Sequence, residues 1–477
     1  MLKKKHFRYR DIDALRAEID ELGLSIRLEE NIEKLFEPVQ IGHKVASNAF
    51  GIHPMEGCDG TLDGKPSELT IRRWERFGTG QAKLIWGEAT AILDEAKANS
   101  RQLVINDQTA SSMETMLNLT RDAHRNAFGA NEEVIVGMQL THSGRYSYKK
   151  PFIAFRHPVV DKTTLIDKKK KIPIPDDYPV LSDDYLERLE DLYVNSAKLA
   201  WKIGFDFVDL KQCHTYLLSE LLAAKTREGK YGGSFENRTR FIRNIIGKIR
   251  AEIGDELILA TRLNVYDGVA YMEDPNTTVG MARDVPTPYP YGFGVDEMNP
   301  PAPDMTEPIK LVGMLKEHGV KLVNVTMGSP YFNPHIGRPF ERPPIDGYET
   351  PEHPLIGVDR HISLTGEIQR AHPELPMVGT GYSWLQRFLI NAGEANIRDG
   401  RVSIVAVGRG ALAYPDYAKD TIEAGEMTQQ KVCVAVSYCT ALMRAKANPL
   451  GQFAAGCVPR DKIYAQIYKD AAKTLKK

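Results

Sequence analysis

The chain has 477 residues, and its 62 Lys and Arg residues nearly balance 63 Asp and Glu residues, which leaves a formal net charge of -1. This length buries one large core or two smaller ones, and the neutral balance excludes a general basic field for nucleic acid or anionic lipid. No apolar run approaches a membrane span, and five scattered cysteines do not make a disulfide framework. We expect a cytoplasmic protein that acts on a small molecule, without nucleic-acid or membrane partners.

Short apolar segments alternate along the chain with longer amphipathic ones. A helix is predicted over 182–203, with Ser182 as N-cap, and another over 237–253, with Gly254 as its stop. Each predicted strand is apolar on both faces and is followed by a helix, a pattern typical of an α/β fold. It favours a (β/α)8 TIM barrel, and a doubly wound open sheet is the second interpretation. The predicted strands cover residues 48–55, 83–90, 134–142, 205–213, 257–265, 321–328, 377–381 and 403–409.

These elements divide the chain into an N-terminal helical extension (1–34), a barrel (35–425) and a C-terminal helical tail (426–477). The two terminal segments are expected to serve as barrel plugs, partner helices or contacts in a homo-oligomer, and the sequence does not choose among these roles. Two connections, 143–181 and 267–304, are long enough to cap the active end of the barrel. The second contains PTPYPYGFG at 286–294, which forms either an aromatic wall for an apolar substrate or a packed surface lid.

The predicted strand ends are polar, and in a barrel the carboxyl ends of the strands carry the chemistry. Arg262 interrupts an apolar strand, so it requires an anionic partner. Glycines allow close approach to a phosphate and Arg can donate two parallel hydrogen bonds to it, so the segments 379–382 (GTGY) and 408–410 (GRG) together predict a phosphate site after the seventh and eighth strands.

Several spaced motifs accompany these strand ends. In order they are LFEPVQIG at 35–42, HPM at 53–55, WGEATA at 86–91, QLTHSGR at 139–145, HTYLLS at 214–219, YGGSFENRTRF at 231–241 and VGRGALAYPD at 407–416. Their order and spacing over about 35–425 resemble the old yellow enzyme family, including its NADH:flavin oxidoreductase and 2,4-dienoyl-CoA reductase branches. The run at 231–241 is the most specific of them.

The resemblance implies that the barrel binds FMN. The isoalloxazine ring would contact Pro54 and Met55 through the backbone, Ala89 near O4, Gln139 at the pyrimidine edge and Arg262 near N1 and O2. A fixed cation at Arg262 would raise the reduction potential of the flavin.

The phosphate of FMN would lie against Gly381, Tyr382, Gly408 and Arg409. Glu56 departs from the family pattern, because many relatives carry Thr or Cys at this position to tune the flavin through a hydrogen bond. A carboxylate donates no such bond unless it is protonated.

The resemblance also implies a reaction in which NADH or NADPH supplies electrons and an α,β-unsaturated carbonyl compound accepts them. Tyr216 would be the proton donor, and His214 and Lys211 would bind the carbonyl oxygen. Lys211 is a departure, since relatives carry His or Asn, and its ammonium would suit an oxyanion or a substrate carboxylate. Alternatively, Lys211 forms an ion pair with Asp209 or Glu88.

His53 and His142 are expected to be structural rather than catalytic. Some relatives hold an iron–sulfur cluster with four closely spaced Cys. Here Cys433, Cys439 and Cys457 lack a fourth ligand and have a different spacing, which argues against a cluster or any other metal. Two other functions stay open: a Schiff-base lyase that uses Lys211, and a non-catalytic barrel that serves as a binding module.

Overall fold

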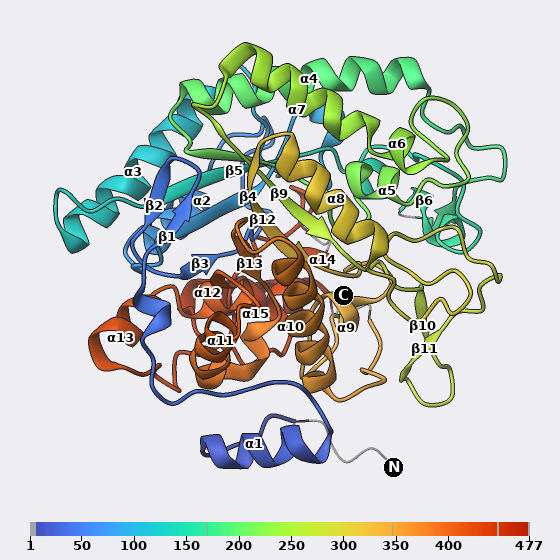
Figure 1. Cartoon of the computed structure of the whole chain (residues 1–477). Helices are drawn as coiled ribbons and strands as arrows, with labels where there is room; N and C mark the ends of the chain where they lie inside the picture. The colour runs from blue at the N-terminus through green and yellow to red at the C-terminus, as the bar shows by residue number, and fades with distance from the viewer. Residues whose placement is uncertain (1–5, 169, 346, 446–447, 476–477) are drawn as a thin grey trace.

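The computed structural model describes residues 6–168, 170–345, 347–445 and 448–475. Eight parallel strands close into a barrel, and strand pairing between the last and the first completes the ring (Figure 1). The predicted (β/α)8 barrel is therefore confirmed, and the open sheet is excluded. The barrel strands are β3 (Phe50–Ile52), β4 (Leu84–Ala91), β5 (Ile135–Thr141), β8 (Phe207–Leu210), β9 (Ile258–Asn264), β12 (Val320–Thr326), β13 (Met377–Gly379) and β14 (Ile404–Val407).

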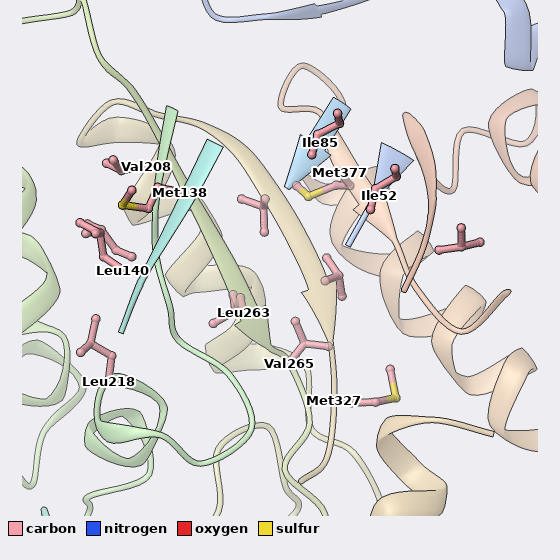
Figure 2. Packing of buried hydrophobic residues seen from close by; sticks show 14 of the residues in the cluster. Ile52, Ile85, Met138, Leu140, Val208, Leu218, Leu263, Val265, Met327 and Met377 are labelled. Carbon is pink, nitrogen blue, oxygen red and sulfur yellow. The ribbon is translucent and has the colours of Figure 1, made fainter. Parts of the chain in front are cut away.

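Helices surround the barrel because each strand presents apolar side chains to both faces. In β4, Leu84 and Trp86 point into the barrel cluster, whereas Ile85 packs against the helices. Figure 2 shows outward residues of this second kind, among them Ile52 and Val208. The surrounding helices are α2 (Glu68–Gly78), α3 (Ala110–Phe128), α4 (Asp183–Lys202), α7 (Arg240–Ile253), α8 (Thr306–Glu317), α10 (Pro354–Ala371), α11 (Leu389–Arg398) and α13 (Tyr417–Ala424).

The predicted helix ends agree with the structure at one helix and differ at the other. Ser182 caps α4 by accepting a hydrogen bond from the Tyr185 backbone N–H, as predicted. The segment predicted as one helix over 237–253 forms two, α6 (Phe235–Arg238) and α7, separated at Thr239. The predicted stop at Gly254 fits, because this residue follows the end of α7 with φ +74°. The earlier start follows from Ser234, which caps α6 by accepting from the Asn237 N–H.

The connection at 143–181 forms 3-10 turns η3 (Gly144–Tyr146) and η4 (Asp161–Thr163) and a hairpin of β6 (Leu165–Asp167) with β7 (Ile172–Pro173). Residue 169 lies outside the described residues. Arg145 anchors the connection because its buried guanidinium pairs with Asp161 and Glu220. This segment therefore has a fixed position beside the barrel mouth.

The connection at 267–304 includes the hairpin of β10 (Tyr271–Glu273) with β11 (Gly280–Ala282), which projects from the barrel in Figure 1. Its aromatic run packs against the first connection: the Tyr289 hydroxyl lies 3.1 Å from His157 Nε2, and the Tyr291 ring stacks on Phe155. Between the two interpretations of this run, the structure favours a packed lid over a substrate wall.

The chain termini add elements at both ends of the barrel. A hairpin of β1 (Val39–Ile41) with β2 (Lys44–Ala46) closes the amino end, where Ile41 and Ala46 join the inner barrel cluster. Residues 1–5 and 476–477 of the predicted extension and tail, and residues 446–447, lie outside the described residues. The remaining elements are α1 (Ile12–Glu21), η1 (Lys34–Phe36), η2 (Asp94–Ala96), α5 (Leu217–Leu222), α9 (Pro334–Gly337), η5 (Tyr382–Phe388), α12 (Arg409–Ala413), α14 (Tyr438–Arg444) and α15 (Lys462–Leu475).

No helix in these described ranges combines the length and the apolar character that a membrane crossing needs. The β1–β2 hairpin thus covers the amino end of the barrel. Its carboxyl end carries the long connections and the tail, and the polar residues singled out from the sequence are found there.

Candidate active site

The carboxyl ends of the barrel strands surround a cavity of about 1020 Å³. Small-molecule pockets commonly measure about 300–1000 Å³, so this one is at the upper end of the range. Every barrel strand, or the loop that follows it, contributes to the wall. Representative lining residues, in strand order, are Met55, Ala89, Gln139, Lys211, Arg262, Pro330, Thr380 and Gly408.

The candidate residues from the sequence converge on this cavity, with one exception. Tyr216, His214 and Lys211 line it, and so do all of the proposed cofactor contacts except Tyr382. The Tyr382 hydroxyl instead accepts a hydrogen bond of 3.0 Å from Asn396 of α11. Gly381 turns the chain with φ +92°, and this turn directs the Tyr382 side chain away from the cavity.

A buried carboxylate on β8 organises one wall of the cavity. Asp209 accepts hydrogen bonds from the Gln139 side-chain amide at 2.6 Å, from Trp86 Nε1 at 2.7 Å and from the Arg262 backbone N–H at 2.7 Å. Burial raises the pKa of Asp209 to about 6, although these three donors oppose the shift. The Gln139 amide is therefore held in one orientation at the cavity wall.

Arg262 lies on the same wall without a carboxylate partner in the described part of the chain. Its side chain is only 9% exposed, its Nε has no hydrogen-bond partner there, and burial lowers its pKa. A buried guanidinium is costly unless an anion compensates it. The electron-rich N1 and O2 edge of an isoalloxazine would be such a partner, so Arg262 fits the predicted flavin.

Two glycine-rich strand ends shape the opposite side of the cavity. A Cβ atom at Gly408 would come within 2.7 Å of Met55 Sδ, and one at Gly381 within 2.8 Å of the His361 side chain. Arg409 is buried, donates one hydrogen bond to the Pro339 carbonyl, and has an Nη1 without a partner among the described residues. Close backbone approach together with an available guanidinium nitrogen suits a phosphate.

Lys211 points into the cavity from the end of β8. Its side chain is 6% exposed, and its Nζ lies 3.8 Å from the centroid of the Tyr216 ring. The described residues offer it no ion pair: Asp209 is engaged as above, and Glu88 pairs with Arg73. The predicted partners of Lys211 are thus held by other donors, so the contacts among the described residues do not support an ion pair of Lys211 with Asp209 or Glu88.

His214 and Tyr216 follow on a strained turn. His214 and Thr215 both have φ near +60°, a left-handed conformation that is uncommon for residues other than glycine. Burial, with Arg262 and Lys211 nearby, lowers the pKa of His214 well below its usual value, so the imidazole is neutral. Burial raises the pKa of the Tyr216 hydroxyl, which keeps its proton.

Glu56 is the one carboxylate among the described residues that line the cavity. Its Oε1 accepts a hydrogen bond from the Asn99 amide, and Cys58 Sγ lies 3.8 Å away. Burial raises the pKa of Glu56 to about 7, an effect that the nearby Lys211 opposes. A substantial protonated fraction therefore exists near neutral pH, and in that form Glu56 can donate a hydrogen bond.

Sequence reasoning missed several wall residues. His53 lines the cavity, where its Nδ1 lies 3.0 Å from Asn324 Nδ2 and its Nε2 has no partner in the described ranges, whereas His142 is structural and bonds Tyr185. The HPM motif was the available signal for His53. Tyr331 also lines the cavity, with its hydroxyl 2.8 Å from that of Tyr216, and no local pattern marks it.

The tail supplies a further part of the wall. Thr440, Met443 and Arg444 of α14 line the cavity, and so do residues 448, 449, 451 and 452. The cavity therefore extends beyond the barrel segment predicted to end at residue 425. Cys433, Cys439 and Cys457 of the same tail are free thiols, and no group of metal-ligating side chains is found in the part of the chain that the structure describes.

Comparisons with known proteins agree with this geometry. The sequence model of the NADH:flavin oxidoreductase / NADH oxidase family matches residues 34–285. An NADPH dehydrogenase of Geobacillus sp. is 27% identical over 391 residues, which are 80% of this chain and 91% of the relative. An NADH oxidase of Thermoanaerobacter brockii is 24% identical over 92% of this chain, which spans 58% of that longer protein.

Solved structures show the same fold. The old yellow enzyme homologue from Zymomonas mobilis aligns with a TM-score of 0.58 and 21% identity, covering 83% of this chain and 95% of that one. A 2-naphthoyl-CoA reductase in complex with 2-naphthoyl-CoA aligns with a TM-score of 0.64 and 17% identity over 91% of this chain, which spans 58% of that enzyme. The resemblance inferred from the motifs is confirmed: the chain belongs to the NADH:flavin oxidoreductase / NADH oxidase family, a family of flavin-dependent NAD(P)H oxidoreductases.

Proposed function

We propose that the protein is an FMN-dependent ene-reductase that uses NADH or NADPH to reduce the carbon–carbon double bond of an α,β-unsaturated carbonyl compound. FMN, when bound, supplies the hydride transfer that links the nicotinamide to the β-carbon of the acceptor. The observation that carries the proposal is the convergence of Tyr216, Lys211 and His214 on the cavity that also contains Arg262, whose Nε has no hydrogen-bond partner among the described residues.

Lys211 and His214 would bind the carbonyl oxygen of the acceptor. Negative charge develops on this oxygen as the double bond is reduced, and a preorganised cation and N–H donor stabilise that charge in a site shielded from water. The neutral His214 offers one ring N–H, and the ammonium of Lys211 already lies on the same wall, 3.8 Å from the Tyr216 ring centroid.

Tyr216 would deliver the proton to the α-carbon. Its raised pKa keeps the hydroxyl protonated at physiological pH, and the hydroxyl of Tyr331 holds it in place. A general acid must reach the reacting atom in the correct protonation state, and the position of Tyr216 on the cavity wall and its retained proton both support this role.

The test separates the two half-reactions under anaerobic conditions, with 2-cyclohexen-1-one as acceptor and flavin absorbance as the signal. In Tyr216→Phe, reduction by NADPH should proceed, and reoxidation by the enone should slow by roughly 10²–10⁴-fold. In Lys211→His, reoxidation should persist, because imidazole also donates to the oxyanion. Reoxidation of Tyr216→Phe at the wild-type rate would refute the proton-donor assignment.

Borohydride trapping addresses the rival lyase. Incubation of wild type with a carbonyl substrate and borohydride should leave Lys211 unmodified, as judged by peptide mass, because the ene-reductase forms no Schiff base. A stable adduct on Lys211 would instead favour the lyase. A preparation that binds no FMN when it is supplied in excess would favour the non-catalytic binding module.

A further inference from the structure

The most specific sequence run, YGGSFENRTRF at 231–241, contributes no residue to the cavity wall. It packs instead against α5 and the residues that follow this helix, and α6, which lies within the run, is beside α5 in Figure 1. The N-cap residue of α5 is Tyr216, the proton donor of the proposed reaction. A contact that fixes α5 therefore bears on the position of Tyr216.

The turn that carries Tyr216 depends on contacts around it. His214 and Thr215 both have positive φ, and such a conformation persists only where the surrounding structure holds it. The helix that follows, α5, has six residues and is too short to be stable alone. Within it, Glu220 pairs with the buried Arg145. The end of α5 that is remote from the cavity needs an anchor of its own.

Two glycines bring the motif against this end of α5. The Gly233 N–H donates a hydrogen bond of 3.0 Å to the carbonyl of Ala224, two residues beyond the helix. A Cβ atom at Gly232 would lie 2.3 Å from the Arg227 carbonyl oxygen, so this close approach of two backbones requires glycine. The glycine pair of the motif thus has a packing role beside α5.

Arg238 joins α5 to two neighbouring segments. Its buried guanidinium donates through Nη1 to the carbonyl of Leu222, the last residue of α5, and through Nε to the Gly233 carbonyl at 3.0 Å. The same group contacts both carboxylate oxygens of Glu307 on α8, at 3.1 and 2.5 Å. The last carbonyls of a helix have no partner within it, and an arginine can supply one. A lysine could not make all four contacts, because its ammonium is a single point charge.

We propose that Arg238 is a positioning residue for the proposed reaction: it clamps the C-terminal end of α5 and thereby holds Tyr216 in place on the cavity wall. The inference rests on the proposed ene-reductase function for the role of Tyr216, whereas the clamp concerns the fold of residues 214–222 alone. Arg238 does not line the cavity, so its effect on the reaction passes through α5.

The kinetic test compares Arg238→Lys with Arg240→Lys in full-length FMN-loaded protein. Arg240 belongs to the same motif but donates to the Lys230 carbonyl and the Asn237 side chain rather than to α5. Anaerobic stopped-flow absorbance with NADPH and 2-cyclohexen-1-one separates the two half-reactions. Arg238→Lys should slow reoxidation by roughly ten- to hundredfold and leave reduction unchanged, because only the proton donor is displaced. Arg240→Lys should leave both rates unchanged.

A double variant shows whether Arg238 acts through Tyr216. In a Tyr216→Phe background the proton donor is already absent, so Arg238→Lys should slow reoxidation further by no more than about threefold. The same further loss in the double variant as in the single one would overturn the inference. Equal slowing of both half-reactions, or normal reoxidation in Arg238→Lys, would also overturn it.

Hydrogen exchange followed by mass spectrometry reports on the clamp without turnover. Amides of residues 214–222 should exchange roughly tenfold faster in Arg238→Lys than in wild type or Arg240→Lys. Glu307→Gln, a second variant, keeps one oxygen for Arg238 and should give the same changes at smaller magnitude. Unchanged exchange in this segment would overturn the inference. Faster exchange combined with normal reoxidation by Tyr216→Phe would leave the clamp standing and refute the proton-donor role in the proposed function.

Discussion

The hydroxyl groups of Tyr216 and Tyr331 lie 2.8 Å apart, and the Tyr331 ring stacks on Tyr146 with centroids 3.6 Å apart. Stacking fixes Tyr331, and Tyr331 in turn restricts the Tyr216 hydroxyl. The proton donor of the proposed reaction is therefore positioned by a residue more than a hundred positions further along the chain.

Replacing Tyr331 by Phe should affect one half-reaction only. Loss of the hydroxyl removes the hydrogen bond that orients Tyr216, so we expect reoxidation of reduced flavin by an enone to slow by roughly tenfold, while reduction by NADPH keeps its rate. Stopped-flow absorbance without oxygen measures both rates. Tyr178→Phe is a suitable control, because that hydroxyl donates to the Pro151 carbonyl outside the cavity wall. Equal slowing of both half-reactions would argue against a positioning role.

Arg262→Met should have opposite effects on the empty and the loaded protein. Without FMN, removal of a buried guanidinium that has no anionic partner within the described ranges should stabilise the fold by about 1–2 kcal/mol. With FMN, loss of the cation should weaken cofactor binding by roughly ten- to hundredfold. Thermal unfolding with and without added FMN measures both effects. Arg262→Lys retains the charge, so its stability and its FMN affinity should lie between those of wild type and Arg262→Met. Destabilisation of the empty protein by Arg262→Met would contradict this account.

Gly408→Ala should impair cofactor binding by a steric effect. The added Cβ would lie 2.7 Å from Met55 Sδ, so the glycine-rich strand end must shift away from the expected position of the phosphate. We expect FMN affinity to fall by about tenfold in fluorescence titrations. Gly247→Ala on α7 is the matched control, since nothing lies within 4 Å of its added Cβ, and it should stabilise the helix by about 0.5–1 kcal/mol. Undiminished affinity in Gly408→Ala would show that this backbone does not approach the ligand.

Glu56→Gln should change how stability depends on pH. The folded protein raises the pKa of Glu56 from 4.5 to about 7, so the folded state binds the proton more tightly than the unfolded state does. The stability associated with this proton is present below pH 4.5 and is lost as pH rises towards 7. Relative to wild type, the Gln variant should gain on the order of 3 kcal/mol between these limits.

Urea unfolding across pH 4 to 8 measures this difference. Glu423→Gln controls for the loss of a carboxyl group at an exposed position of α13. Parallel stability profiles for Glu56→Gln and wild type would show that the carboxyl proton is bound equally in both states.

All eight barrel strands could be predicted from the sequence, because each is a short apolar segment buried on both faces and followed by a helix. Lys211, Tyr216 and Arg262 could also be predicted as site residues, because a barrel brings the ends of its strands together. The start of the helix near residue 237 could not be predicted from apolar periodicity, because it is set by the capping contact of Ser234 with the Asn237 backbone. Helix boundaries depend on local contacts of this kind.

Tyr331 and Arg444 could not be found from local pattern. Both reach the cavity through long-range packing: Tyr331 from the loop after β12, and Arg444 from a tail helix that crosses to the barrel mouth. The aromatic run at 286–294 left two interpretations open, a substrate wall and a packed lid, and the contact between Tyr289 and His157 favours the lid. The composition of a loop predicts which interactions its side chains can make. Whether those side chains point into the cavity depends on contacts that form only in the folded chain.

The placement of α14 on the cavity wall has a consequence for modularity. A barrel that ended at residue 425 would retain all barrel strands and the β1–β2 hairpin, but its cavity would lose the part of the wall that α14 supplies. Exchange of α14 for another segment would therefore change the side chains on this part of the cavity wall, whereas the strand-end residues would keep their identity.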